Sequence, residues 1–351
     1  MLVRGAPAHT RALDVALYQA EPGRLAARGL ILDLRKRGLV PMAGDLQAAG
    51  VIHRMSVDAQ IELDGPRLHS IRAEQPDVAF EPSPGTGGEC CRDPVRRIEA
   101  LAGAALDEGF ARRLGAAIGG PLGCSHVLTL AQLLGSTTRS ALEAERDAWG
   151  GPTGRRPGER LFDRSLSIDG LESPDGGLQL ALQLADLHLA PAPPEAEPLE
   201  RLRRQHEIRV QATVDLTAMK LVRIVASERV DAARSVEETP WQALDVGFLE
   251  GHNVLAGLAR TLFETLAPTP AQRPLLDVLL NLAPSVIQCM PALTNYWQRW
   301  RAARAESGAD LQPRGNGGPM GGMLDSCYMW RREGALQRRL TATPSPTDAA
   351  D

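Results

Sequence analysis

The chain repeats part of its own sequence at a spacing of 153 residues. Residues 53–73 align without a gap on residues 206–226, and seven of the 21 aligned positions are identical, His53 and its counterpart His206 among them. A repeat of this length predicts two copies of one folding unit, which bury their apolar faces against each other.

The same spacing relates residues upstream of this segment. It pairs Arg11 with Arg164 and Asp33 with Asp186. Two separated segments that agree on one offset indicate an internal duplication. We therefore expect five regions: a first repeat over residues 1–149 that carries the candidate site, a linker over 150–160, a degenerate second repeat over 161–310, a Gly-rich loop and docking segment over 311–334, and a partly disordered tail over 335–351.

Alternating side chains predict strands in each copy. Apolar and polar residues alternate from Met55 to Leu63 and from Ile208 to Leu216, which is the period of a half-buried strand. Further strands are expected near 11–19, 25–34, 164–169 and 177–189, and helices over about 94–102, 107–118, 124–148, 241–267 and 271–303. The expected fold class is α+β: two pseudo-symmetric repeats, each an antiparallel sheet followed by packed helices.

Charge and targeting signals limit the compartment and the partners. A formal net charge of −4 gives no electrostatic reason for a nucleic-acid partner. Residues 1–30 lack the apolar core of a secretory signal, and the most apolar segment, 274–290, contains Asp277 and Pro284, which favours a buried helix over a membrane span. Five cysteines, an odd number, predict no disulfide framework. We expect a cytoplasmic protein, and its richness in Ala, Gly and Arg is typical of bacteria with GC-rich genomes.

A thiol and an imidazole stand two residues apart at an expected helix start. The residues are Cys124 and His126, in the segment Gly123-Cys-Ser-His126. Free amides and the helix dipole at that position favour a thiolate. Such a pair can bind one metal ion or act as nucleophile and base, while its structural interpretation is a buried Cys beside a helix-start His.

Other candidate residues come from the first copy alone. His53 retains its counterpart in the second copy, so it can be structural, whereas His9 falls on Phe162 and is not required by a shared fold. Cys91 follows a Gly-rich loop. The second copy restores neither the thiol of Cys124 nor the imidazole beside it, which predicts a single site in the N-terminal copy.

Two further features have mainly structural interpretations. Asp33 and its counterpart are expected to be hydrogen-bond acceptors at strand ends rather than catalytic acids. The apolar segment 325–330, which contains Cys327, must dock somewhere, and closure over the site is its functional interpretation. The chain has no Ser-His-Asp signature, H-E-x-x-H motif, Walker A loop or dinucleotide-binding fingerprint.

In the order of these motifs, the sequence resembles a bacterial family known as domain of unknown function 2889. The matching pieces, in chain order, are His9-Thr-Arg11, Ile52-His53-Arg-Met55, Cys91, Gly123-Cys-Ser-His126 and Asp325-Ser-Cys327-Tyr. Arg54 stands where the family usually has an acidic residue, and Ser125 stands for its usual Thr. The resemblance is best over about 9–140 and near 323–334.

The resemblance implies a set of ligands but no activity. The implied ligands are His9, His53, Cys91, Cys124, His126 and Cys327. Mixed Cys and His sets suit zinc or iron. Our first hypothesis is an enzyme in which Cys91, Cys124 and His126 bind zinc or iron, with His53 or His9 as fourth ligand or general base. The catalytic candidates are then His9, His53 and Cys124.

The expected reaction is a hydrolysis or lyase step on a small, partly apolar organic molecule. The resemblance implies aromatic or lipid-like catabolites, because family members often lie among genes for their breakdown. Two alternatives stay open: a metal-free thiol enzyme that uses Cys124 and His126, and a non-catalytic metal or iron–sulfur scaffold or small-molecule binding protein. We expect no nucleic-acid or membrane partner and allow for a homodimer.

Overall fold

The computed structural model covers most of the chain. It describes residues 5–42, 45–151, 154–193, 195–231, 239–266, 269–293 and 322–341, together with residue 302. Three expected parts therefore lie almost wholly outside the described residues: the end of the expected helix (residues 294–303), most of the expected Gly-rich loop (residues 311–321) and the end of the expected tail (residues 342–351).

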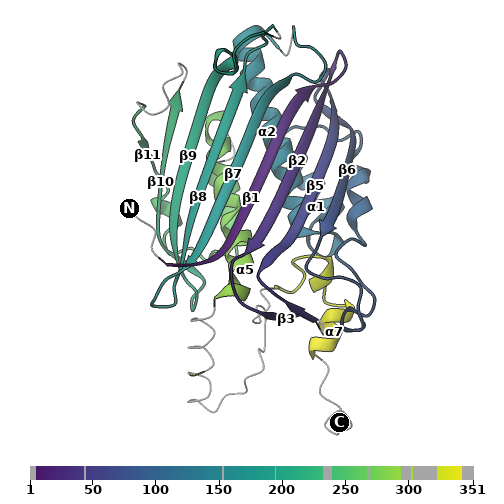
Figure 1. Ribbon diagram of the computed structural model, residues 1–351, viewed down its shortest axis with the longest axis vertical. Helices are drawn as coiled ribbons and strands as arrows, with labels where there is room; N and C mark the ends of the chain where they lie inside the picture. Colours follow the sequence, from purple (N-terminus) through teal and green to yellow (C-terminus); the bar gives the residue numbers. More distant parts are fainter. Residues whose placement is uncertain are drawn as a thin grey trace.

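A large antiparallel sheet dominates the fold (Figure 1). Its nine strands run in the order β11-β10-β9-β8-β7-β1-β2-β5-β6, so that β1 and β7 are neighbours in the middle. The strands are β1 (Ala6–Gln19), β2 (Arg24–Arg35), β5 (Gly50–Glu62), β6 (Arg67–Asp77), β7 (Arg160–Glu172), β8 (Leu178–Leu189), β9 (Leu202–Asp215), β10 (Lys220–Asp231) and β11 (Gln242–Leu244); β3 (Val40–Met42) and β4 (Asp45–Gln47) form a separate pair.

Helices cover one face of this sheet (Figure 1). The α-helices are α1 (Phe110–Ile118), α2 (Ser125–Trp149), α3 (Leu258–Leu266), α4 (Arg273–Leu280), α5 (Leu282–Cys289) and α7 (Ala335–Thr341). Short 3₁₀ helices are η1 (Pro84–Thr86), η2 (Val95–Leu101), η3 (Gly120–Leu122), η4 (Pro198–Arg201), η5 (Gly247–Leu249), η6 (Pro270–Gln272), η7 (Met290–Ala292) and η8 (Tyr328–Trp330). The α+β class with an antiparallel sheet is confirmed.

The core lies between the sheet and the helices. Along β8, Leu178, Leu180, Leu182 and Leu184 are buried while the residues between them are partly exposed, which is the alternation expected of a strand with one covered face. On β7, Gly170 allows α5 to approach closely, since a Cβ atom there would lie 2.1 Å from a sulfur on that helix.

The prediction of one helix, over residues 241–267, is largely wrong. Of the segment 241–267, residues Gln242–Leu244 form β11 beside β10, and helix α3 begins only at Leu258. Gly251 and Gly257 have φ angles of +82° and +81°, a left-handed backbone that a helix interior cannot contain. The helical spacing of the apolar residues could not reveal these two interruptions.

The segment expected to link the two copies is anchored to the rest of the molecule by a buried arginine. Arg155 has a fully buried side chain, and its guanidinium donates to Glu145 of α2 at 2.5 Å. Strand β7 then begins at Arg160 and joins the sheet beside β1. The N-terminal and C-terminal strands therefore share one sheet rather than two.

The most apolar segment packs as core. Residues Pro270–Ala292 are long and apolar enough to cross a membrane by length and composition alone, but 67% of their most apolar window is buried inside the protein. The expectation of a buried helix over 274–290 is confirmed by α4 and α5, which pack on the sheet.

A small second cluster of buried side chains lies beside the main core. It contains Val40, Phe80, Met329 and Leu336, with Cys327 partly buried against it. Residues Met329 and Leu336 belong to η8 and α7, so the segment after residue 321 packs on the first half of the chain.

Candidate metal centre

Asp33 lies at the centre of the site, on the helix-covered face of β2. The sheet register places it beside Arg11 on β1 and His53 on β5. Its fully buried carboxylate accepts two hydrogen bonds from Arg11, with 2.8 Å from Nε to Oδ1 and 3.0 Å from Nη2 to Oδ2. A planar two-point contact of this kind fixes both side chains.

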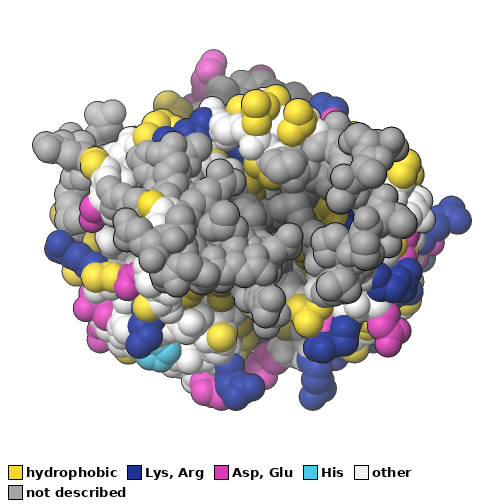
Figure 2. Space-filling model, turned by 90° about the horizontal axis from the view of Figure 1, so that it is seen from below, with side chains coloured by type: hydrophobic (Ala, Val, Ile, Leu, Met, Phe, Trp, Pro, Cys, Tyr) yellow, Lys and Arg dark blue, Asp and Glu magenta, His cyan; other side chains and the backbone are white. Residues whose placement is uncertain are grey.

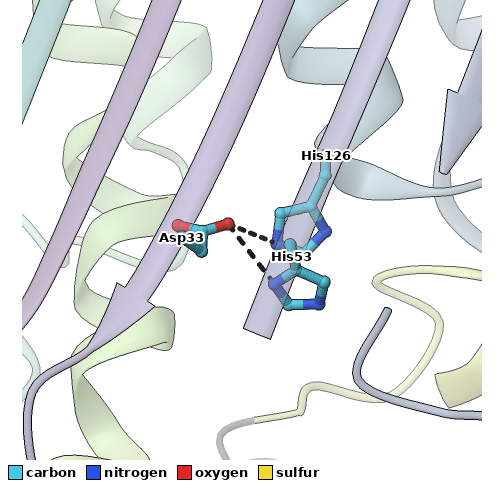
Figure 3. Close-up of side chains that lie close together, drawn as sticks. All are labelled: Asp33, His53 and His126. Carbon is cyan, nitrogen blue, oxygen red and sulfur yellow. Dashed lines mark ion pairs between the residues drawn. The ribbon is translucent and has the colours of Figure 1, made fainter. Parts of the chain in front are cut away.

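Two imidazole rings converge on this carboxylate (Figure 3). Nδ1 of His53 and Nε2 of His126 each lie 3.3 Å from Oδ2 of Asp33. His126 is the second residue of α2, and the centroids of the two rings are 3.9 Å apart. The two nitrogens and the carboxylate oxygen all lie within 4.8 Å of one another. Three distant parts of the sequence thus present three possible metal-ligand atoms at one place.

The protonation states suit a cation. Burial lowers the pKa of His126 to about 3 and the pKa of His9 to about 4. Burial raises the pKa of Asp33, but Arg11 and the imidazoles of His126 and His53 act more strongly and hold that pKa well below its ordinary value. At neutral pH the site offers the ionised carboxylate of Asp33 and the neutral imidazoles of His126 and His9, the forms that bind metal ions.

Ring nitrogens without hydrogen-bond partners support this fit. Among the described residues, the buried Nδ1 of His53 and Nε2 of His9 have none, the latter lying 3.5 Å from Oδ1 of Asp33. Tetrahedral zinc with bonds of about 2.0–2.2 Å separates its ligand atoms by roughly 3.3–3.6 Å. The two nitrogen–oxygen separations of 3.3 Å match that spacing. Nε2 of His126 also lies 3.1 Å from the amide nitrogen of Gln288, a contact that a metal ion would replace.

Three thiols lie close to this group. Sγ of Cys124 is 3.8 Å from Nδ1 of His126, the ring nitrogen that faces away from Asp33. Cys91 is near enough to both Cys124 and Cys327 for their charges to raise its pKa. The sulfur atoms are not members of the group of donors within 4.8 Å of one another around Asp33.

The expectation that the helix start would favour a thiolate needs correction. Burial raises the pKa of Cys124 to about 11, although the backbone amides of Val127 and His126 act in the opposite direction as expected. Burial also raises the pKa of Cys91 and of Cys327. Desolvation of the thiolate outweighs the helix-terminal amides, so these thiols are neutral at pH 7.

A cavity of about 240 Å³ brings the candidate residues together. Residues of β1, β2, β5 and α5 line it at the lower end of the molecule in Figure 1. Figure 2 views the molecule from this end, and charged side chains lie around the edge of that view. The wall of the cavity includes all the residues proposed from the sequence: His9, His53, Cys91, Cys124, His126 and Cys327. Cys90 is not part of this wall. Its sulfur lies 4.0 Å from Oε2 of Glu81 and 3.6 Å from Nη1 of Arg92.

Asp33 is the residue whose importance the sequence did not reveal. We expected a strand-end hydrogen-bond acceptor, and it does accept from Arg11, but it also faces two imidazoles. A signal was present in the repeat, because Arg11, Asp33 and His53 all keep their residue type at the same offset. Three polar positions retained together indicate a shared cluster.

The corresponding cluster in the second half lacks the imidazole pair. Arg164 binds Asp186 through two hydrogen bonds of 2.6 Å and also contacts Asp277 of α4 at 2.5 Å. Ser136 donates to Asp277 at 2.6 Å, and His206 pairs with a glutamate of β10 instead of the aspartate. In the second half the arginine thus contacts a second carboxylate, which Arg11 does not do among the described residues.

A comparison with known families finds a match to the N-terminal part of the chain. Residues 9–139 match the model of a family described as "Protein of unknown function (DUF2889)". The resemblance to this family seen in the sequence is confirmed over these residues. No curated protein matches the chain.

Proposed function

We propose that this protein is a metal-dependent enzyme, with Asp33, His53 and His126 as the ligands of one zinc or iron ion. The observation that carries the proposal is the convergence of two ring nitrogens and one carboxylate oxygen within 4.8 Å of one another. Two histidines and one carboxylate occur in catalytic zinc sites and in non-haem iron(II) sites, both of which keep positions open for substrate.

The proposed reaction is hydrolysis or a lyase step on a small, partly apolar organic molecule. A bound metal ion would supply polarisation of a carbonyl or activation of water. Arg11 holds Asp33 ionised and oriented, as an outer partner does for a ligand carboxylate. We propose His9 as a fourth ligand or as the base, because its buried Nε2 has no hydrogen-bond partner among the described residues.

The alternative is thiol chemistry without a metal. Cys124, His126 and Asp33 lie in the order of nucleophile, base and orienting carboxylate, with successive distances of 3.8 and 3.3 Å. The opposed pKa values, about 11 for Cys124 and about 3 for His126, disfavour proton transfer between them in the free protein. Loss of activity on thiol alkylation, in protein that contains no metal, would support this alternative.

Elemental analysis tests the proposal. Protein purified without chelators should contain about one zinc or iron per chain, and His53→Ala/His126→Ala should lose it. His69→Ala is the matched control, because His69 lies on β6 outside the cavity with 43% of its side chain exposed. Wild-type protein without metal, or a double variant that keeps it, would reject the proposed ligands.

We further propose that the two halves of the chain are duplicated copies, the second having lost the site. The pairing of β1 with β7 in mid-sheet and the equal arginine–aspartate register in both halves support this. The protein is proposed to act in the bacterial cytoplasm on a small-molecule catabolite, as a monomer or homodimer.

A further inference from the structure

Arg35, the last residue of β2, is a buried cation without an acidic partner in the part of the chain that the structure describes. Only 3% of it is exposed, and it lines the cavity together with Arg11. Its Nη2 donates to the backbone carbonyls of Gln47 and Ala48, each at 2.8 Å. Its buried Nε has no hydrogen-bond partner, and no carboxylate of the described residues forms an ion pair with it.

An unpaired buried charge is costly to a folded protein. Removal of a guanidinium from water costs several kcal/mol unless an anion compensates it. Asp33 does not do so, because its single negative charge is already paired with Arg11. Among the described residues nothing compensates the charge of Arg35, which makes it suited to pair with an anionic ligand.

The cavity as a whole carries excess positive charge. Its wall contains two arginines, and no Asp or Glu of the described residues is part of it. Asp33, just outside the wall, neutralises only one of them. Nη1 of Arg11 is also buried and unpartnered among the described residues. Any bound metal cation adds to this imbalance rather than relieving it.

One part of the wall is apolar. Phe80 and Trp330 meet edge to face with 5.8 Å between ring centroids, and Ile287 and Met329 line the same space. A volume of about 240 Å³ is below the range of about 300–1,000 Å³ typical of drug-sized ligands. The ligand is therefore small, with an anionic end and an apolar body.

We propose that the cavity binds a small carboxylic acid as its anion, with the carboxylate on Arg35 and the apolar body against Phe80 and Trp330. Arginine suits this role because its planar donors match a carboxylate. The inference rests on the proposed function in that this acid is taken to be the substrate of the metal centre. It also makes Arg35 the residue that selects acids over neutral analogues.

Binding of matched neutral and anionic probes tests this. Benzoate and hexanoate, and their amides benzamide and hexanamide, would be titrated by calorimetry at millimolar concentration into wild type, Arg35→Met and Arg35→Lys. Wild type should bind at least one acid tenfold or more tighter than its amide. Arg35→Met should abolish that preference, and Arg35→Lys should retain part of it. Arg96→Met, with a 90% exposed side chain on η2, is the matched control and should bind like wild type.

Each outcome bears on the inference. Equal binding of acid and amide by wild type, binding of neither acid, or an undiminished preference in a folded Arg35→Met variant would overturn it. The comparison within wild type holds even if Arg35→Met fails to fold.

Titrations with chelator-treated and metal-loaded protein separate the two proposals. An Arg35-dependent preference in metal-free protein upholds the acid site even if no metal is ever found, whereas metal-dependent binding that ignores Arg35 upholds only the metal centre.

Discussion

At the scale of single residues, the account depends on Asp33. Its carboxylate neutralises Arg11 on one side and faces His53 and His126 on the other, in a position without exposure to solvent. The same residue therefore serves stability through the arginine and the candidate site through the imidazoles. These two roles can be measured separately. The stabilising role is measured by unfolding the metal-free protein, and the ligand role is measured by metal binding.

Asp33→Asn should strongly destabilise the metal-free protein. The substitution leaves the Arg11 guanidinium buried without its counter-charge, and breaking a buried pair costs about 3–5 kcal/mol. Urea unfolding measures the change. Asp58→Asn is the control, because Asp58 is 35% exposed and lies 3.9 Å from Arg28, so its loss should cost under about 1 kcal/mol. Equal costs for the two variants would contradict this account of the pair.

At the scale of elements, a buried carboxylate ties helix α4 to the sheet. Asp277 of α4 contacts Arg164 of β7 and accepts a hydrogen bond from Ser136 of α2. Burial raises its pKa to about 6, against the opposing effect of Arg164. A carboxyl whose folded pKa exceeds its unfolded pKa contributes stability below the unfolded pKa and loses that contribution as pH rises through the folded pKa.

The free energy of unfolding should therefore carry a falling contribution from Asp277 between about pH 4 and pH 6. With an unfolded pKa near 3.9, the shift corresponds to roughly 3 kcal/mol. Asp277→Asn should remove that contribution, as measured by urea unfolding across this pH range, while the exposed Asp147→Asn should not. An unchanged pH profile in Asp277→Asn would show that the carboxyl is ionised throughout.

The elements also show what the sequence could and could not reveal. Alternation along strands such as β5 and β8 was predictable, since each strand has one face under the helices. Helices with a continuous apolar stripe, such as α2, were predictable for the same reason. The segment before α3 was not, because local glycine conformations and an edge pairing with β10 decide it. For the site, the cysteines and histidines were recognisable as residue types, but the convergence on Asp33 depends on strand register.

At the scale of the whole molecule, the C-terminal segment forms one wall of the cavity through its own small core. Met329 is 1% exposed in that cluster, which is separate from the main core between sheet and helices. Arg331 holds the segment through an ion pair with Glu89, and the backbone amide of Tyr328 donates to the carbonyl of Gly123 at 2.8 Å. The C-terminal segment should therefore detach from the sheet without global unfolding.

Met329→Ala should release the segment locally. A cavity left by Met→Ala costs about 2–5 kcal/mol, which is drawn from the small cluster rather than from the main core. Trypsin should then cut after Arg331 or Arg338 faster than in wild type, while the main unfolding transition stays nearly unchanged. Leu122→Ala, at a 41% exposed position, is the control. Cleavage that appears only together with global unfolding would show that the segment is part of one cooperative unit.

The central claim, a metal ion held by Asp33, His53 and His126, is tested most directly by anomalous diffraction from metal-loaded crystals, recorded at the zinc and iron absorption edges. The account predicts one peak between Oδ2 of Asp33, Nδ1 of His53 and Nε2 of His126. A peak among the thiols of Cys91, Cys124 and Cys327 instead, or no peak near Asp33, would contradict it.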